Sequence, residues 1–360
     1  MRWKNESRIC NGPARIHPVS GMIGSYLSLQ TRETTLRPSY WILHEYPCNT
    51  AGRQKQPPMI GYRHTAEKDV KVENFMRRRI IITGATSGIG LETVKSLATD
   101  EYEIILGCRD RQKTERLVHE ITSKSPKALI HHYLLDLASF ASIKTFSQQI
   151  HTDFTSIDIL FNNAGVFVDS AKKSTEGFEL TLGVNYLGSY YLTNLLIDLL
   201  KEGKTPQIIN ICSRAALFGK FRNRPDFFKK HAHGFRAYSA SKMMQLVMTL
   251  DMADKLKVFG ISVNAVHPGE VATNIWKGDS LLMKMIAPMQ KKRLQTAKEG
   301  AQAGLHLVTH KELWKETGKF YEKAGEEIVI KKRLTDLELA VLIKEFTERT
   351  IESIDSDYLS

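Results

Sequence analysis

The sequence predicts an α/β fold in which a Rossmann-type, doubly wound parallel sheet forms a single domain after a long N-terminal extension. Two patterns support this prediction. From Met76 onward, short β-branched runs alternate with amphipathic helical stretches, as expected of βαβ units and of a parallel sheet covered on both faces. The first of these units has a glycine-rich turn between its strand and its helix. Ligands of such sheets bind beyond the carboxyl ends of the strands, so the residues just after each strand matter most.

The expected elements follow one another along the chain with short connections. β-branched and apolar runs predict strands at residues 80–82, 104–107, 129–135, 157–161, 207–211, 261–266 and 319–322. Apolar residues at helical spacing predict five helices. They are expected near residues 91–98, from the second strand to about residue 123, from the third strand to residue 150, at residues 178–200 and at residues 237–257. A charged, amphipathic helix is expected at the carboxyl end, near residues 334–347.

Residues 1–75 show neither period, and prolines and turn-formers are spread through them, so we expect this stretch to be largely disordered. Its one strand-like piece, residues 40–43, is too short and isolated to build a core. Up to Leu43 the stretch is rich in Arg and poor in acids, which loosely fits an organellar transit peptide. The favoured alternative is that translation starts at Met76 and that the upstream residues are an over-extended reading frame. The domain is expected to span residues 76–360.

Composition places the chain among ordinary globular proteins. Its 360 residues are 42% hydrophobic and 25% charged, which is enough for one large α/β core. The net charge of +12 comes from Lys and Arg scattered among acids, so a nucleic-acid function is disfavoured and affinity for anionic small molecules is favoured. No apolar run reaches the roughly 18 residues that a membrane-spanning helix needs.

The cysteines indicate a reducing compartment. Cys10, Cys48, Cys108 and Cys212 form no C-x-x-C pair and no cluster with metal-ligand spacing, so no metal site is expected. We therefore expect a cytoplasmic protein, with organellar import as the alternative if residues 1–75 are a genuine transit segment.

Two turns after predicted strands have the residue types of a nucleotide site. Residues 83–90 have the spacing G-x-x-x-G-x-G, and glycines in such a turn let backbone amides and a helix N-terminus approach a pyrophosphate. The place of this turn between a strand and a helix strengthens a signal that is weak by itself. Residues 162–165, Asn-Asn-Ala-Gly, end another strand and either line a cofactor crevice or form a plain turn.

One predicted helix carries a candidate general acid. Tyr238 and Lys242 lie four residues apart and therefore on one helical face. An ammonium group beside a phenol favours the phenolate and lowers the tyrosine pKa toward working pH, as a general acid for a carbonyl requires. The same spacing also occurs on solvated helices, so the pair alone decides little.

Together these motifs resemble the short-chain dehydrogenase/reductase family over nearly all of residues 77–350. The matching elements are residues 83–90, Asp136-Leu137, residues 162–165, Asn185, Ser213, residues 238–242, and Pro268-Gly269 followed by Thr273. The resemblance implies an NAD(P)-dependent oxidoreductase that acts on CH–OH groups and moves a hydride between nicotinamide and a carbonyl or alcohol.

The resemblance also implies a role for each of four catalytic side chains. Tyr238 would donate a proton to the carbonyl oxygen as the hydride arrives, and Ser213 would hydrogen-bond that oxygen. Lys242 would hold the ribose and tune Tyr238, and Asn185 would support a water relay. The family usually has Ser or Gly at the position of Cys212, a change that we expect only to alter packing.

The implied cofactor site uses the same loops. In the family, the Asp136 position contacts adenine, the loop that starts at Pro268 holds the nicotinamide, and Thr273 matches the residue that bonds the carboxamide. The full expected set is Gly84, Ser87, Gly88, Ile89, Gly90, Arg109, Asp136, Leu137, Asn163, Ala164, Gly165, Tyr238, Lys242, Pro268, Gly269, Val271 and Thr273.

The end of the second strand indicates a preference for NADP(H), with NAD(H) as the alternative. An enzyme that prefers NAD usually places Asp or Glu there, and that carboxylate repels a 2′-phosphate. This chain has Arg109, with Arg111 and Lys113 nearby, and a guanidinium pairs with phosphate in a bidentate way. Asp110, one place later, fits this interpretation least, and Arg109 as the start of a solvated helix is the alternative.

Two further features resemble the retinol-dehydrogenase-like branch of the family. One is the long insert of residues 214–237, and the other is residues 317–321 followed by an amphipathic helix. Residues 274–296, rich in Met, Leu and Ile, are expected either to form an apolar flap over the site or to be ordinary helix packing. A flap would favour an apolar substrate.

A different class of function stays open: a catalytically silent nucleotide-binding sensor or scaffold with the same fold. The presence of Asn185, Ser213, Tyr238 and Lys242 argues against it, because a pure binder has no need of a Tyr and Lys pair beside Ser213. The expected partner is a small-molecule carbonyl or alcohol. The resemblance also implies a homodimer or homotetramer that associates through long helices.

If residues 1–75 are untranslated or disordered, a chain that begins at Met76 should fold, bind NADPH and melt within about a few degrees of the full-length chain. Thermal melting and NADPH fluorescence titration measure these properties. Insolubility or loss of cofactor binding in the shortened chain would show instead that the extension packs on the domain.

Overall fold

The computed structural model describes residues 77–230, 233–271, 295–323, 325–356 and 358. The expectations for residues 1–75, for Thr273 and for residues 274–294 of the flap lie outside the described residues. Within the described part, eight strands form one sheet in the order β3-β2-β1-β4-β5-β6-β7-β8.

The sheet is parallel from β3 to β7, and β8 adds an antiparallel edge. This order, with its switch point between β1 and β4, is that of a doubly wound sheet, so the predicted fold class is confirmed. Each predicted strand is present, whereas β8 is too short to leave a sequence pattern. The strands are β1 (Arg78–Thr83), β2 (Tyr102–Cys108), β3 (Leu129–Leu134), β4 (Ile159–Asn162), β5 (Gln207–Ile211), β6 (Ser262–His267), β7 (Phe320–Glu322) and β8 (Glu326–Glu327).

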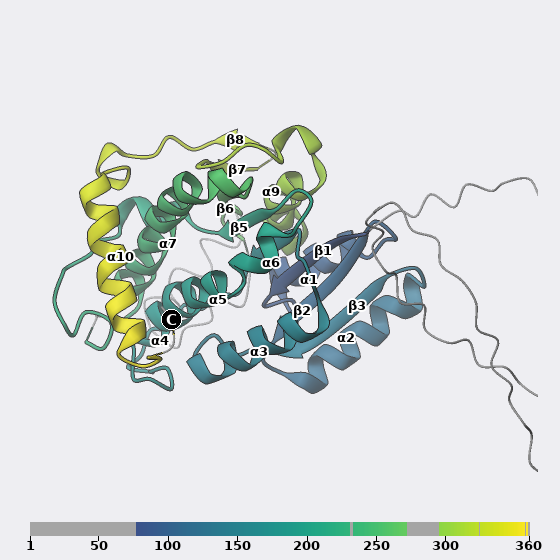
Figure 1. Ribbon diagram of the computed structural model, residues 1–360, viewed down its shortest axis with the longest axis horizontal. Helices are drawn as coiled ribbons and strands as arrows, with labels where there is room; N and C mark the ends of the chain where they lie inside the picture. Colours follow the sequence, from purple (N-terminus) through teal and green to yellow (C-terminus); the bar gives the residue numbers. More distant parts are fainter. Residues whose placement is uncertain (1–76, 231–232, 272–294, 324, 357, 359–360) are drawn as a thin grey trace, which may run out of the picture. The chain divides into compact units, whose positions relative to one another are not determined.

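Helices cover both faces of the sheet (Figure 1). Alternate side chains of β1 show why: Ile80 and Ile82 enter one hydrophobic core and Ile81 the other, and all three are fully buried. The first core is completed by α1 (Gly88–Leu97), α2 (Arg111–Lys124) and α9 (Ala297–Thr309). The second core is completed mainly by α3 (Phe140–Asp153), α5 (Ser189–Leu195), α6 (Ile197–Lys201), α7 (Phe235–Leu256) and α10 (Leu337–Glu352).

The helix predicted at residues 178–200 is interrupted in the structure. A short α4 (Leu180–Leu182) continues into a π-helical segment, η1 (Gly183–Gly188), before α5 and α6. Residues 181–193 are all buried, so no apolar period along them marks where the helical winding changes. Single π-helical turns often occur at functional sites, and this one carries Asn185.

Helix α10 lies against α7 and the η1–α5 segment (Figure 1). The Tyr186 hydroxyl hydrogen-bonds the Thr347 hydroxyl at 2.8 Å, and the Tyr190 hydroxyl donates to Glu348 at 3.3 Å. The predicted C-terminal helix is therefore part of the domain core.

The long insert of residues 214–237 also packs into this core. Phe227 and Phe228 are buried, and the rings of both lie against Phe346 of α10, with centroids 6.3 Å and 5.2 Å away. The insert begins with a 3₁₀ turn, η2 (Arg214–Phe218), directly after Ser213. The insert, which in the sequence resembles the retinol-dehydrogenase-like branch, thus links the residues after Ser213 to the C-terminal helix.

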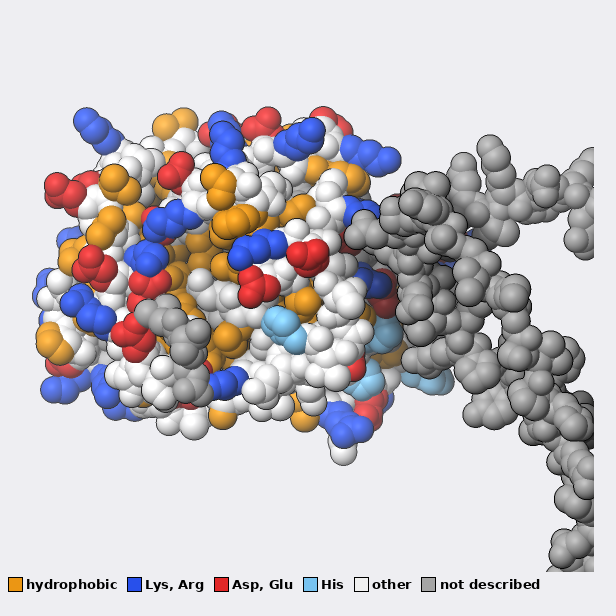
Figure 2. Space-filling view, viewed as in Figure 1, with side chains coloured by type: hydrophobic (Ala, Val, Ile, Leu, Met, Phe, Trp, Pro, Cys, Tyr) orange, Lys and Arg blue, Asp and Glu red, His pale blue; other side chains and the backbone are white. Residues whose placement is uncertain are grey.

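Charged side chains of both signs are interspersed on the face seen in Figure 2. Among the helices that the structure describes, none combines the length and the apolar character needed to cross a bilayer. In the same residues, no three His, Cys, Asp or Glu side chains come together as metal ligands.

The Tyr186–Thr347 hydrogen bond can be tested with a double-mutant cycle. The Thr347 hydroxyl also donates to Ile343, so the Tyr186 hydroxyl is the donor between the two. Tyr186→Phe and Thr347→Val should each reduce the free energy of unfolding by about 1 kcal/mol, and the double variant by less than the sum. Urea unfolding measures this, and strictly additive losses would show that the bond contributes nothing.

Candidate active site

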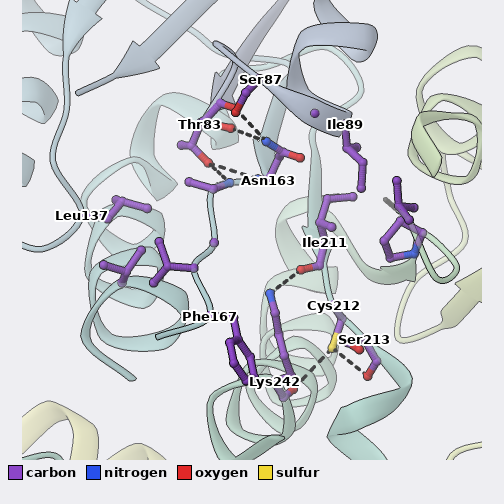
Figure 3. Close-up of a pocket in the computed structure, with 18 of the residues that line it drawn as sticks. Thr83, Ser87, Ile89, Leu137, Asn163, Phe167, Ile211, Cys212, Ser213 and Lys242 are labelled. Carbon is purple, nitrogen blue, oxygen red and sulfur yellow. Dashed lines mark hydrogen bonds between the residues drawn. The ribbon is translucent and has the colours of Figure 1, made fainter. Parts of the chain in front are cut away.

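A cavity of about 740 Å³ opens at the carboxyl ends of the parallel strands. Figure 3 shows its lining, which comes from the turns after strands β1 to β6 and from the first turns of α7. Of the predicted site residues, those that line the cavity are Gly84, Ser87, Gly88, Ile89, Arg109, Asp136, Leu137, Asn163, Ala164, Gly165, Ser213, Tyr238, Lys242, Pro268, Gly269 and Val271.

The two turns with nucleotide-site composition are bonded to each other. The Thr83 hydroxyl accepts from the backbone amides of Asn163 (3.1 Å) and Ala164 (2.9 Å), and the Asn163 side chain donates to the Thr83 carbonyl at 2.8 Å. Gly84 has φ 66°, and a Cβ there would lie 2.8 Å from the Ala164 Cα. The close contact of the turns therefore requires a glycine at this position.

Gly90 lies behind the cavity wall. A Cβ on this residue would come within 2.5 Å of the Asn163 side-chain nitrogen and 2.6 Å of the Gly84 carbonyl oxygen. It therefore allows α1 to approach the turn, while Ser87, Gly88 and Ile89 reach the cavity. Ser87 caps α1 without a side-chain hydrogen bond, so the first backbone N–H groups of this helix are not capped by its hydroxyl.

The end of β2 places Arg109, Asp110 and Lys113 along the cavity. The Asp110 carboxylate caps α2 by accepting from the Lys113 backbone amide at 2.9 Å. Its acceptor capacity is thus partly used within its own helix. Arg109 is exposed and precedes the capped helix.

On the other side of the cavity, the backbone after β3 is fixed by short-range bonds. The Asp136 carboxylate accepts from the Ala138 amide at 2.9 Å, and the Asp136 amide donates to the Ser142 hydroxyl at 2.9 Å. Leu137 beside it is buried. These bonds hold the two residues at the cavity wall.

Asn185 lies behind the cavity wall and holds the β4 loop. Its side-chain oxygen accepts from the Val166 amide at 2.7 Å, and its side-chain nitrogen donates to the Val166 carbonyl at 2.9 Å and to the Ser241 hydroxyl at 3.2 Å. The π-helical turn thus joins the loop after β4 to α7. Its side chain is fully engaged with protein groups.

Ser213 and Tyr238 meet inside the cavity. The Ser213 hydroxyl is hydrogen-bonded to the Tyr238 phenol, and the Phe167 ring lies 5.7 Å from the phenol ring between centroids. Burial raises the pKa of Tyr238 to about 12, although the bond from Ser213 acts in the opposite direction. The phenol therefore holds its proton at neutral pH.

Lys242 extends from α7 toward the end of β5 (Figure 3). Its ammonium donates to the Ile211 carbonyl at 2.7 Å and to the side-chain oxygen of Gln245 at 3.0 Å. Burial lowers the pKa of Lys242 to about 8. The expectation that Lys242 lowers the pKa of Tyr238 is wrong for this structure, because burial of the phenol dominates and raises that pKa.

Comparison with known sequences identifies the family. The sequence model described as short chain dehydrogenase matches residues 78–281, which include the turns at residues 83–90 and 162–165, Ser213 and Tyr238. The chain belongs to the short-chain dehydrogenase/reductase family. Members of this family are oxidoreductases that bind a nicotinamide cofactor.

Relatives place this short-chain dehydrogenase/reductase in the retinol-dehydrogenase-like branch, as the sequence predicted. Retinol dehydrogenase 12 of Homo sapiens is 35% identical over 246 residues, which are 67% of this chain and 76% of the relative. Retinol dehydrogenase 11 of Homo sapiens is 33% identical over 229 residues, which are 64% of this chain and 72% of the relative.

Solved structures share the fold. L-sorbose reductase from Gluconobacter frateurii, complexed with NADPH and L-sorbose, has a TM-score of 0.57 at 17% identity and covers 71% of this chain and 98% of its own. Salutaridine reductase from Papaver somniferum has a TM-score of 0.53 at 24% identity, covering 68% and 99%. At such identities the likeness concerns the fold alone.

The position of Cys212, where the family usually has Ser or Gly, lies between β5 and α7 in this short-chain dehydrogenase/reductase. The thiol is buried and donates to the Lys242 carbonyl at 3.4 Å. Burial raises its pKa to about 11, so the neutral thiol is the form present at neutral pH. It acts as a packing group with one weak hydrogen bond to the helix.

Several lining residues were not predicted from the sequence. Phe167, Phe218 and Phe235 all line the cavity, and the last two are 64% and 52% exposed. Phe167 lies just past a strand end, which the rule for doubly wound sheets could have singled out. Phe218 and Phe235 lie in the insert, and no sequence signal marks them.

His267, the last residue of β6, also lines the cavity and was not predicted. Burial lowers its pKa to about 4, and its Nδ1 has no hydrogen-bond partner, so the ring is neutral at physiological pH. It lies beside an ion pair between Arg214 and Glu322. Its place at a strand end is a signal that could have found it.

Proposed function

We propose that this protein is an NADP(H)-dependent oxidoreductase that transfers a hydride between nicotinamide and the carbonyl or alcohol of an apolar small molecule. The observation that carries the proposal is the buried Tyr238 phenol, hydrogen-bonded by Ser213 in a cavity that also contains the glycine-rich turn. Proton donor and dinucleotide site thus share one space.

The residues along the cavity fit a dinucleotide. The uncapped N-terminus of α1 and the turn at Gly84 suit a pyrophosphate, which needs backbone N–H groups and close approach. Asp136 and Leu137 would hold the adenine, and Pro268, Gly269 and Val271 the nicotinamide. Lys242 would bind the ribose hydroxyls.

In carbonyl reduction, Tyr238 is the general acid and Ser213 orients the substrate. The bound nicotinamide supplies the hydride. The Tyr238 Oη releases its proton to the carbonyl oxygen, and the Ser213 hydroxyl hydrogen-bonds the same oxygen. The buried phenol keeps its proton at neutral pH, so the proton is available for transfer to the carbonyl oxygen. Asn185 would contribute to the relay that restores the proton by fixing the β4 loop, since its side chain is already bonded to protein groups.

Apolar substrates are favoured by the walls near Tyr238. Phe167, Phe218 and Phe235 offer ring surface, and Val166 and Val168 add aliphatic surface. Covering exposed aromatic rings with an apolar ligand removes their surface from water, which contributes favourably to the free energy of binding. Retinal, other apolar aldehydes, quinones and steroids are the compounds to assay first.

A second candidate is a nucleotide sensor or scaffold with the same fold, which would bind NADPH without turning over any carbonyl. The hydrogen bond between Ser213 and Tyr238 favours the enzyme, since a protein that only binds NADPH gains nothing from this pair.

A cytoplasmic location and a homodimer or homotetramer remain part of the proposal. Helix α10 already covers the side of α5 and α7, so subunit contacts would use other surfaces.

Tyr238→Phe keeps the ring but removes the proton donor, so turnover should fall at least about a hundredfold while NADPH affinity changes little. The assay is loss of NADPH absorbance with the best carbonyl of the panel above. Tyr102→Phe, a buried tyrosine at the start of β2, is the matched control and should keep its activity. A Tyr238→Phe variant with most of its activity would show that another group is the acid.

Arg109→Ala tests the cofactor preference. A hydrogen bond to a charged group contributes roughly 1.5 to 3 kcal/mol, so kcat/KM with NADPH should fall about ten- to a hundredfold and that with NADH hardly at all. Arg111→Ala is the control, because Arg111 pairs with Glu115 at 2.8 Å. Equal losses with both cofactors, or a wild type that prefers NADH, would contradict the NADP assignment.

A further inference from the structure

The Lys242 ammonium is held by two protein oxygens, and one of them belongs to a side chain with no assigned role. The Ile211 carbonyl accepts at 2.7 Å and the Gln245 side-chain oxygen at 3.0 Å. An ammonium has three N–H donors, so these bonds leave one for a ligand in the cavity that Lys242 lines. The two acceptors therefore set the direction of the third donor.

Gln245 is well placed to hold this ammonium. It lies three residues after Lys242 on α7, hence on the same helical face, and it is almost completely buried. Its backbone carbonyl accepts from the Thr249 hydroxyl at 2.7 Å, and that hydroxyl accepts from Asn210 of β5 at 2.9 Å. These bonds join this turn of α7 to the same strand that supplies Ile211.

Because Lys242 has no carboxylate partner among the described residues, the neutral amide oxygen of Gln245 matters for its charge. The titratable groups facing it are the Cys212 thiol at the end of β5 and the Tyr238 phenol one turn earlier on α7. Among the described residues, no carboxylate forms an ion pair with Lys242. A buried ammonium without a counter-ion depends on hydrogen-bond acceptors to remain charged.

We propose that Gln245 is a positioning residue, whose amide oxygen keeps the Lys242 ammonium charged and directs its remaining N–H to the cavity. The inference rests on the proposed function, in which Lys242 binds the ribose hydroxyls. Gln245 itself does not line the cavity, so its effect acts through Lys242.

The test compares Gln245→Leu with Gln245→Glu in the full-length chain. Leu removes the acceptor, which disfavours the charged lysine, so the pKa of Lys242 should fall. As the pH is raised, carbonyl reduction should then be lost at a lower pH than in the wild type. Glu supplies a carboxylate, so the pKa of Lys242 should rise and activity should persist to higher pH. We expect the alkaline limb of kcat/KM to move by about half a pH unit or more in opposite directions, which reduces the activity of the Leu variant at least about twofold near pH 8.

A second readout does not depend on turnover. NADPH affinity, measured by fluorescence titration over the same pH range, should weaken as Lys242 loses its charge and should show the same opposite shifts. If Tyr238→Phe retained its activity, the catalytic proposal would fail while this titration still reported on Gln245. Gln207→Leu, which removes a buried amide at the start of β5, is the control and should lower the melting temperature without moving either pH profile.

Opposite shifts in the two variants support the inference. Unchanged profiles, or shifts in the same direction, would overturn it, because a merely structural glutamine has no reason to move the limb according to the charge of its replacement. If the Leu variant fails to fold, the Glu variant decides by itself: an alkaline limb that stays at the wild-type pH contradicts the role of Gln245.

Discussion

The hydrogen bond from the Lys242 ammonium to the Ile211 carbonyl joins helix α7 to the end of the central strand β5, and the arrangement of the site depends on it. Helix α7 carries Tyr238, and β5 continues through Cys212 to Ser213. The Cys212 amide donates to the Val266 carbonyl of β6 at 2.7 Å, so the chain stays aligned with the sheet until Ser213. Phenol and hydroxyl can meet because both supporting elements are held at this point.

Burial, more than charge pairing, sets the protonation states in the cavity. Desolvation raises the pKa of Tyr238 to about 12 and that of Cys212 to about 11, and it lowers that of Lys242 to about 8 and that of His267 to about 4. In each case burial shifts the pKa in the direction that favours the neutral form. At pH 7 the phenol therefore keeps its proton and the lysine keeps its charge, which is the combination that carbonyl reduction requires. Of these four groups, only Lys242 has a pKa close to neutral pH, so a small change around it would alter its charge.

Sequence patterns predicted the strands, the glycine-rich turn and most of the cavity lining because these depend on local chemistry. The β-branched residues 80–82 predict a strand, and Gly84 predicts a tight turn, from the residue types at those positions alone. Gly90 and Asn185 were assigned to the site by motif, yet the structure places both behind its wall, where they hold the turns in contact. The π-helical turn and Gln245 have no local sequence signal, since their significance arises from contacts with residues distant in the sequence.

The wall of the cavity near Phe218 depends on contacts with residues that belong to none of the family motifs. The turn after Ser213 is held from the far end of the chain: Arg333 donates to the Leu217 carbonyl at 2.7 Å and to the Gly219 carbonyl at 3.2 Å. The Lys331 ammonium lies 5.1 Å from the centroid of the Phe218 ring. Substitutions near residue 333 can therefore move a wall of the cavity without touching the Ser213–Tyr238 pair. In the proposed function, the reacting groups and the wall that faces the substrate belong to separate segments, so relatives can share the first while differing in the second.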